Sequence, residues 1–208
     1  MKNNRFNRIN RFIHWAIAFT LLFLLTTVLL RMGWMNSNGV GDIIQKNLAK
    51  SGTQISSKDA VAIAKEVRRP MWQLHYIAGY TMIGLYLLRM VLTAIQVASY
   101  KGPFNKTATT KEKFKAWVYI VFYALLAVSM FTGFMTLNGP KSLHSIMSAI
   151  HTKSIYYVVM FIIIHIAGVL IADAGTEPKI ISKIISGEKP IDNKKTLAEN
   201  ALFPENKQ

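Results

Sequence analysis

The apolar positions of the chain are concentrated in four long stretches that polar segments separate. These stretches cover about residues 10–31, 71–98, 115–137 and 150–173. A helix needs roughly 20 mostly apolar residues to cross ~30 Å of hydrocarbon, and each stretch reaches that length. The pattern therefore predicts an all-α membrane protein whose four transmembrane helices form a bundle.

The polar segments predict two further short helices. Residues 56–67 open on a Ser-Ser-Lys-Asp sequence that resembles a capping box and continue with apolar positions at helical spacing. This predicts an amphipathic helix in the first loop. Residues 179–185 contain four isoleucines and two lysines, which fits either a short helix in the membrane interface or a solvated linker. The chain thus divides into a four-span domain, residues 1–175, and a polar tail, residues 176–208.

Charge refines this interpretation. The 208 residues include 25 Lys and Arg against 10 Asp and Glu, a formal net charge of +15. Such an excess often indicates a nucleic-acid partner, but the positive mean hydropathy of +0.26 argues against a soluble DNA-binding domain. If the N-terminus lies inside, 15 basic residues fall on inner segments and 9 on outer ones. Because basic residues favour the cytoplasmic side, both termini are predicted to lie in the cytoplasm.

The chain contains no cysteine. This excludes disulfides, thiolate-held iron–sulfur clusters, Cys-ligated zinc and covalent haem attachment through a C-x-x-C-H motif. A metal or cofactor must therefore be held by His, Met, carboxylates or non-covalent packing.

Four of the five histidines, His14, His75, His151 and His165, lie in or at the ends of the apolar spans. Ionisable groups inside a membrane are costly unless they have partners, so each of the four is a functional candidate. His151 and His165 are fourteen residues apart, which returns them to within ~40° of one helical face, about 21 Å apart along the axis. The remaining histidine, His144, lies in a short connection and is interpreted as a surface residue.

The alternation of the spans predicts two pairs of histidines at matched depths. His14 would meet His165 near the inner side, and His75 would meet His151 near the outer side. Two imidazoles on opposite sides of an iron are what a six-coordinate haem needs. Each histidine alone is also compatible with a polar anchor at the interface, but two depth-matched pairs favour two non-covalently bound haems.

Three more residues near these histidines are candidates. Gly79 and Gly168 follow His75 and His165 by four and three positions, so a flat macrocycle could approach the backbone there. Ordinary packing of small residues between helices explains both glycines equally well. Arg89 follows His75 by fourteen positions, and an intramembrane arginine needs a partner. A haem propionate or a quinone carbonyl would serve, as would lipid phosphates reached by snorkelling.

These residues resemble the bacterial cytochrome b561 and nickel–iron hydrogenase b-type cytochrome superfamily of four-helix dihaem membrane proteins. The resemblance rests on the Arg-Phe-Ile-His-Trp sequence at residues 11–15, on the segment 75–89, and on the spacing of His151 and His165. It covers roughly residues 8–175.

The resemblance implies two haem b groups in a protein of the bacterial inner membrane, surrounded by lipid, that transfers electrons between the quinone pool and a partner at the outer face. Some members are membrane subunits of a periplasmic hydrogenase or dehydrogenase, and the b561 branch includes an enzyme that oxidises superoxide and reduces ubiquinone. The tail segment 177–189 is similar to the hydrogenase-type branch. The long first loop departs from the compact b561 pattern and leaves the branch, and with it any enzymatic activity, open.

Two functions of other classes compete with electron transfer. A metal or proton transporter would use the same histidines, but the apolar cores of the spans contain no Asp or Glu to neutralise a cation or relay protons. A purely structural anchor would leave four intramembrane histidines unexplained. Electron transfer is therefore the leading hypothesis.

Overall fold

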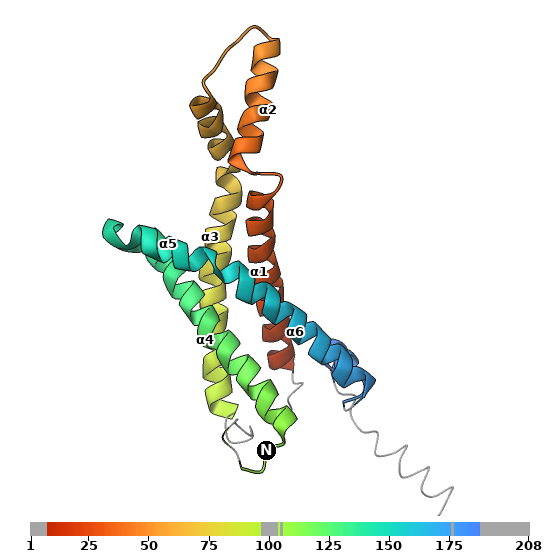
Figure 1. The fold of residues 1–208 in the computed structure, drawn as a ribbon. Coiled ribbons are helices and arrows are strands. Elements are labelled where there is room, and N and C mark those ends of the chain that lie inside the picture. The colour runs from red at the N-terminus through yellow and green to blue at the C-terminus, as the bar shows by residue number, and fades with distance from the viewer. Residues whose placement is uncertain (1–7, 97–103, 105, 176, 188–208) are drawn as a thin grey trace, which may run out of the picture.

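The computed structural model of the chain describes residues 8–96, 104, 106–175 and 177–187. Across these residues every regular element is a helix and no strand is present (Figure 1), which confirms the all-α prediction. The elements in chain order are α1 (Arg8–Met32), α2 (Ser37–Lys50), α3 (Ser57–Gln96), α4 (Thr110–Asn138), the short 3₁₀ turn η2 (Lys141–Leu143), α5 (His144–Thr152), α6 (Ser154–Ala174) and α7 (Ile180–Ser186).

Four segments of the described chain are long and apolar enough to cross a membrane. They are α1, α3, α4 and the stretch Lys141–Ala174, which contains η2, α5 and α6. Large apolar side chains lie exposed along all four, including Phe19, Val91, Phe131 and Ile163. Surfaces of this kind suit contact with lipid, and α-helices satisfy their backbone polar groups internally as a bilayer requires. The chain is therefore a membrane protein with four spans.

The fourth span is interrupted, whereas the sequence pattern suggested one continuous helix. α5 ends at Thr152 and α6 begins at Ser154, with Lys153 donating its backbone N–H to Ile150 O at 3.1 Å in a tighter turn. The Thr152 hydroxyl donates to the carbonyl of Ala149 at 3.1 Å. Side-chain hydroxyls that bond to nearby backbone groups compete with the regular helix, which accounts for the break at this polar run.

The first loop forms a helical hairpin that projects beyond the bundle (Figure 1). The predicted amphipathic helix is real but is continuous with the second span, because α3 runs without interruption through Pro70. α2 was not predicted. It packs on the start of α3, where Ala60 and Ala64 are 1% and 2% exposed. A Cβ built on Gly41 would lie 3.1 Å from the Val61 side chain, so a glycine permits the close approach of the two helices.

The spans form two layers. α1 packs against α3, whereas α4 packs against α5 and α6. An apolar cluster joins the layers with buried residues from α1, α3, α4 and α6: Leu21, Met82, Phe122, Leu126 and Val158. The cluster lies between two ends of the bundle, which we call the hairpin end, where α2 projects, and the tail end, where α7 lies.

The tail forms a helix, α7, that folds back onto the start of α1. The Arg11 guanidinium donates to the carbonyl of Ile185 at 3.2 Å, and the Trp15 indole N–H donates to the carbonyl of Ile184 at 3.3 Å. Of the two interpretations of residues 179–185, the helix is the one that the structure contains. These bonds position α7 beside the residues that flank His14.

Candidate functional site

The structure brings the four histidines of the spans together in two pairs. At the tail end, His14 of α1 faces His165 of α6, and the ring centres are 6.1 Å apart. At the hairpin end, His75 of α3 faces His151 of α5, and the ring centres are 6.4 Å apart. All four residues are half-buried. Each pair joins one helix from each layer, so both lie at the interface between the layers.

These separations fit an iron held between two imidazoles. Two imidazoles that bind one metal from opposite sides have ring centres about 6 Å apart, because each metal–nitrogen bond is about 2 Å long and the ring centre lies roughly 1 Å further back. The observed 6.1 and 6.4 Å match this geometry. Both pairs therefore have the spacing that a haem iron with two histidine ligands requires.

At the hairpin end, hydrogen bonds hold both rings through Nδ1. Thr27 Oγ1 donates to the carbonyl of Leu24 and lies 2.6 Å from His75 Nδ1, so its oxygen accepts the proton of that nitrogen. His151 Nδ1 lies 2.9 Å from the carbonyl oxygen of Ser129, which can only accept. Nδ1 is thus the protonated nitrogen of each ring, and Nε2 keeps the lone pair that binds metal.

Gly133 of α4 makes room for one of these rings. A Cβ built at this position would lie 2.8 Å from His151 Cε1, closer than real Cβ atoms come. Gly133, Thr27 and Ser129 were not identified from the sequence. Each of them is a small or polar residue inside an apolar span, and this is the sequence feature that could have identified them. Packing alone, however, is the commoner reason for such residues.

At the tail end, aromatic rings surround the histidines. Phe161 stacks on His165 with ring centres 5.5 Å apart, and Tyr119 meets the same imidazole edge-on at 6.2 Å. Trp15 lies edge-on to His14 at 5.7 Å. Arg89 of α3 is half-buried and follows His75 by fourteen positions in the direction of the tail end. Its place beside this pair stays a prediction.

The two candidate glycines border open space. A Cβ built on Gly79 or Gly168 would meet nothing within 4 Å, which leaves room beside the backbone for a flat group. Gly84 is equally open, so this observation does not single out the two candidates. Their role toward a macrocycle stays a prediction.

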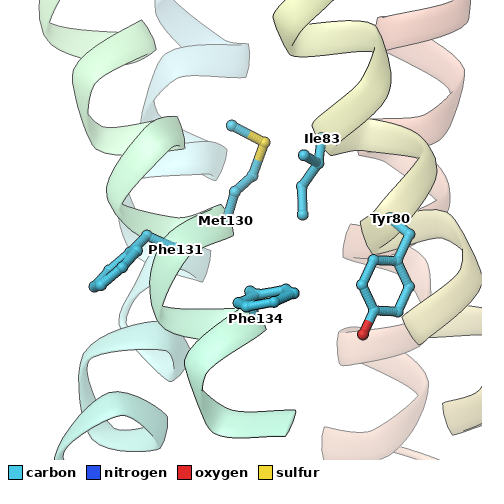
Figure 2. A pocket seen from close by; sticks show the side chains of 5 residues that line it. All are labelled: Tyr80, Ile83, Met130, Phe131 and Phe134. Carbon is cyan, nitrogen blue, oxygen red and sulfur yellow. The ribbon is translucent and has the colours of Figure 1, made fainter. Parts of the chain in front are cut away.

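A separate apolar groove of about 290 Å³ lies between α3 and α4. Phe134 points from α4 toward Tyr80 of α3, and Met130 and Ile83 lie beside them on the two helices (Figure 2). No histidine lines the groove. It marks incomplete packing between the two layers and is distinct from the histidine pairs.

Within the described ranges, no three or more His, Asp or Glu side chains gather as a site for a free metal ion. Each pair offers two nitrogen ligands and nothing more. A lone transition-metal ion usually takes four or more ligands, whereas the iron of a haem receives four from the macrocycle and needs only axial ones. The donor set therefore fits haem and not a free ion.

Comparison with known proteins supplies the family. A family model described as prokaryotic cytochrome b561 matches residues 5–187 of the 208. No curated protein and no solved structure matches the chain. The family match covers all four spans and both histidine pairs, and it agrees with the resemblance that the sequence carries. The chain belongs to the prokaryotic cytochrome b561 family and is a membrane b-type cytochrome that takes part in electron transfer.

Proposed function

We propose that the chain is a dihaem cytochrome of the bacterial inner membrane that passes electrons between the quinone pool and a redox partner at the outer face. The observation that carries the proposal is the spacing of the two histidine pairs, with ring centres 6.1 and 6.4 Å apart at opposite ends of the bundle. One haem b at each pair would give two redox centres across the membrane. The hairpin end would face outward, and both termini would lie in the cytoplasm.

The residues of the chain have distinct tasks in this proposal. His75 and His151 would bind the hairpin-end iron through Nε2, and Thr27 and Ser129 orient their rings. His14 and His165 would bind the tail-end iron. A bound haem supplies reversible one-electron chemistry, while the protein sets its potential through ligands, burial and nearby charge.

Two features of the fold support transfer between the ends. The buried cluster around Met82 excludes water from the middle of the bundle. Within it, the rings of Phe122 and Phe161 stack with centres 3.4 Å apart, and Phe161 also stacks on His165. This packing keeps the distance between the two pairs fixed. Arg89, near the tail-end pair, would bind a haem propionate or a quinone carbonyl.

The projecting hairpin favours a protein partner at the outer face. A membrane subunit of a periplasmic hydrogenase or dehydrogenase would use such a surface, and α2 with the start of α3 provides it. A superoxide:quinone oxidoreductase would not need the hairpin. We therefore place the subunit role ahead of the oxidoreductase that acts alone.

The haem content of the purified full chain tests the proposal. The protein is expressed in haem-replete cells, purified in detergent, and assayed for haem b per chain and for reduced-minus-oxidised spectra. We expect two haems per chain and two resolved midpoint potentials. A folded preparation without haem, or with a single haem, would overturn the dihaem proposal. Oxidation of the reduced protein by a water-insoluble quinone in proteoliposomes is expected, and its absence would remove the quinone pool as a partner.

A further inference from the structure

Two arginines at the hairpin end have no part in the function proposed so far. Arg31 lies in the last turn of α1, and its guanidinium carbon lies 5.5 Å from the centre of the Trp72 ring, within range of a cation–π interaction. Trp72 in turn meets the His75 ring edge-on, with centres 5.1 Å apart. Contacts therefore lead from Arg31 through one aromatic ring to the hairpin-end pair.

Arg68 lies on the same face of α3 as Trp72 and His75. The three residues are spaced by four and then three positions, which places them one above another along a helix. Arg68 is seven residues before His75, about 10 Å along the axis. Its Nη1 donates to the carbonyl of Met35 at 3.1 Å. This bond draws the side chain toward the turn that follows α1, on the side of Arg31.

Arg31 and Arg68 bring two positive charges to the same region of the hairpin end. The hydrogen bond to the Met35 carbonyl holds Arg68, which is half-buried, beside the turn that follows Arg31 in the chain. The Nε atom of Arg68 is buried and has no hydrogen-bond partner. Within the residues that the structure describes, neither Arg31 nor Arg68 forms an ion pair with a carboxylate, whereas the adjacent Arg69 pairs with Glu66.

Two neighbouring cations beside an apolar ring are costly unless an anion joins them. Arginine binds carboxylates through paired hydrogen bonds, and these are among the strongest polar contacts in proteins. A haem at the hairpin-end pair would bring two propionate carboxylates to this region. The number and sign of these charges match the two guanidinium groups.

We propose that Arg31 and Arg68 bind the propionate carboxylates of the hairpin-end haem. The inference rests on the proposed function, because it requires a haem between His75 and His151. The two positive charges favour the reduced haem, which carries one negative charge more than the oxidised form. Arg31 and Arg68 therefore hold the midpoint potential of the hairpin-end haem above the value it would have without them.

The test compares redox titrations of the detergent-purified holoprotein with those of Arg31→Gln, Arg68→Gln and the double variant. The hairpin-end haem is identified as the one that His75→Ala removes. In the double variant, we expect the reduced-to-oxidised ratio of the hairpin-end haem at a fixed potential to fall about tenfold. This equals a decrease of about 59 mV in its midpoint potential for one electron. The potential of the tail-end haem stays unchanged.

Arg69→Gln is the matched control. Arg69 is adjacent to Arg68, exposed and paired with Glu66, so its loss removes one positive charge, as each single variant does, without touching the proposed site. If Arg31→Gln and Arg68→Gln each titrate like Arg69→Gln while both haems are present, the inference is wrong and the proposed function stands. If no haem is present in the unmodified protein, the proposed function itself fails.

Two further measurements keep the result decisive. Should the glutamine variants lose the hairpin-end haem, the lysine variants Arg31→Lys and Arg68→Lys retain the charge and are expected to retain both the haem and most of its potential. Loss of the haem in the lysine variants as well would assign the arginines a folding role and overturn the inference. A wild-type potential that changes with added acetate would show that the arginines bind a carboxylate from solution, and would also overturn it.

Discussion

The two ends of the bundle hold their histidines by different means. At the hairpin end, His75 and His151 are hydrogen-bonded through Nδ1 to Thr27 and to the carbonyl of Ser129. At the tail end, stacked and edge-on aromatic rings take that place, and within the described chain neither His14 nor His165 makes such a bond. The ring spacings are therefore similar at the two ends. At the hairpin end hydrogen bonds fix the tautomers of the histidines, whereas at the tail end packing alone holds the rings.

Because the two sites are held differently, they should respond to different substitutions. Hydrogen bonds that metal-binding histidines donate to neighbouring oxygens fix the ring and raise its basicity, so the hairpin end depends on a few named atoms. The tail end depends on the fit of several rings, in which no single contact dominates.

The largest expected effect comes from removing a ligand. His165→Ala should lower haem b from two per chain to one and abolish the tail-end signal, and His75→Ala should do the same for the hairpin end. The measurement is haem per chain together with redox titration. His144→Ala, at an exposed position, serves as the control and should retain two haems. Retention of both haems in either ligand variant would refute the pairing on which the comparison rests.

A methyl group beside His151 is expected to have the next largest effect. In Gly133→Ala the new Cβ would lie 2.8 Å from His151 Cε1, so the ring must move. Overpacking of this kind costs about 1–3 kcal/mol, which corresponds to roughly a 5- to 150-fold weaker hairpin-end haem in a competition assay with apo-myoglobin. Gly84→Ala, where a Cβ meets nothing within 4 Å, is the matched control. Equal haem affinity in the two variants would contradict the packing argument.

The spans and the histidines could be predicted from the sequence because both signals are local. Each apolar run is long enough to be identified on its own, and an imidazole such as His165 stands out in a run of isoleucines. The all-α prediction was confirmed for the same reason. α2 was missed because its sequence includes two glycines and two asparagines, which weakens the local preference for helix.

The residues that support the histidines could not be predicted because their roles arise only in the folded bundle. Thr27 is 48 positions from His75, and Ser129 is 22 positions from His151. The apolar core of α4 contains no Lys, Arg, Asp, Glu or His, yet this helix meets His151 at two positions, Ser129 and Gly133. Contacts between distant helices decide these roles, and a single sequence carries no record of them.

Loss of the hydrogen bond to His75 is expected to weaken the hairpin-end haem by about tenfold. Thr27→Val keeps the shape of the side chain but removes the acceptor of the Nδ1 proton, and one hydrogen bond contributes about 1 kcal/mol, with second-shell losses reaching 10- to 100-fold. Haem affinity and the hairpin-end potential are the measurements.

Thr26→Val is the control for this substitution. The Thr26 hydroxyl donates only to the carbonyl of Leu22, so its loss leaves both histidine pairs intact. A hairpin-end haem of unchanged affinity in Thr27→Val would mean that the metal alone orients the ring, and the contrast between the two ends would disappear.

The smallest expected effect lies at the tail end, where α7 rests on α1. Trp15→Phe keeps an aromatic ring beside His14 but removes the donor to the carbonyl of Ile184, a bond of 3.3 Å. A long, partly exposed hydrogen bond contributes about 0.5 kcal/mol, so amide hydrogen exchange in α7 should rise roughly twofold while both haems and their potentials are retained. Trp117→Phe, at an exposed position of α4, should leave this exchange unchanged. If Trp15→Phe instead releases the tail-end haem, that site also depends on one polar contact, and the two ends are held by the same means after all.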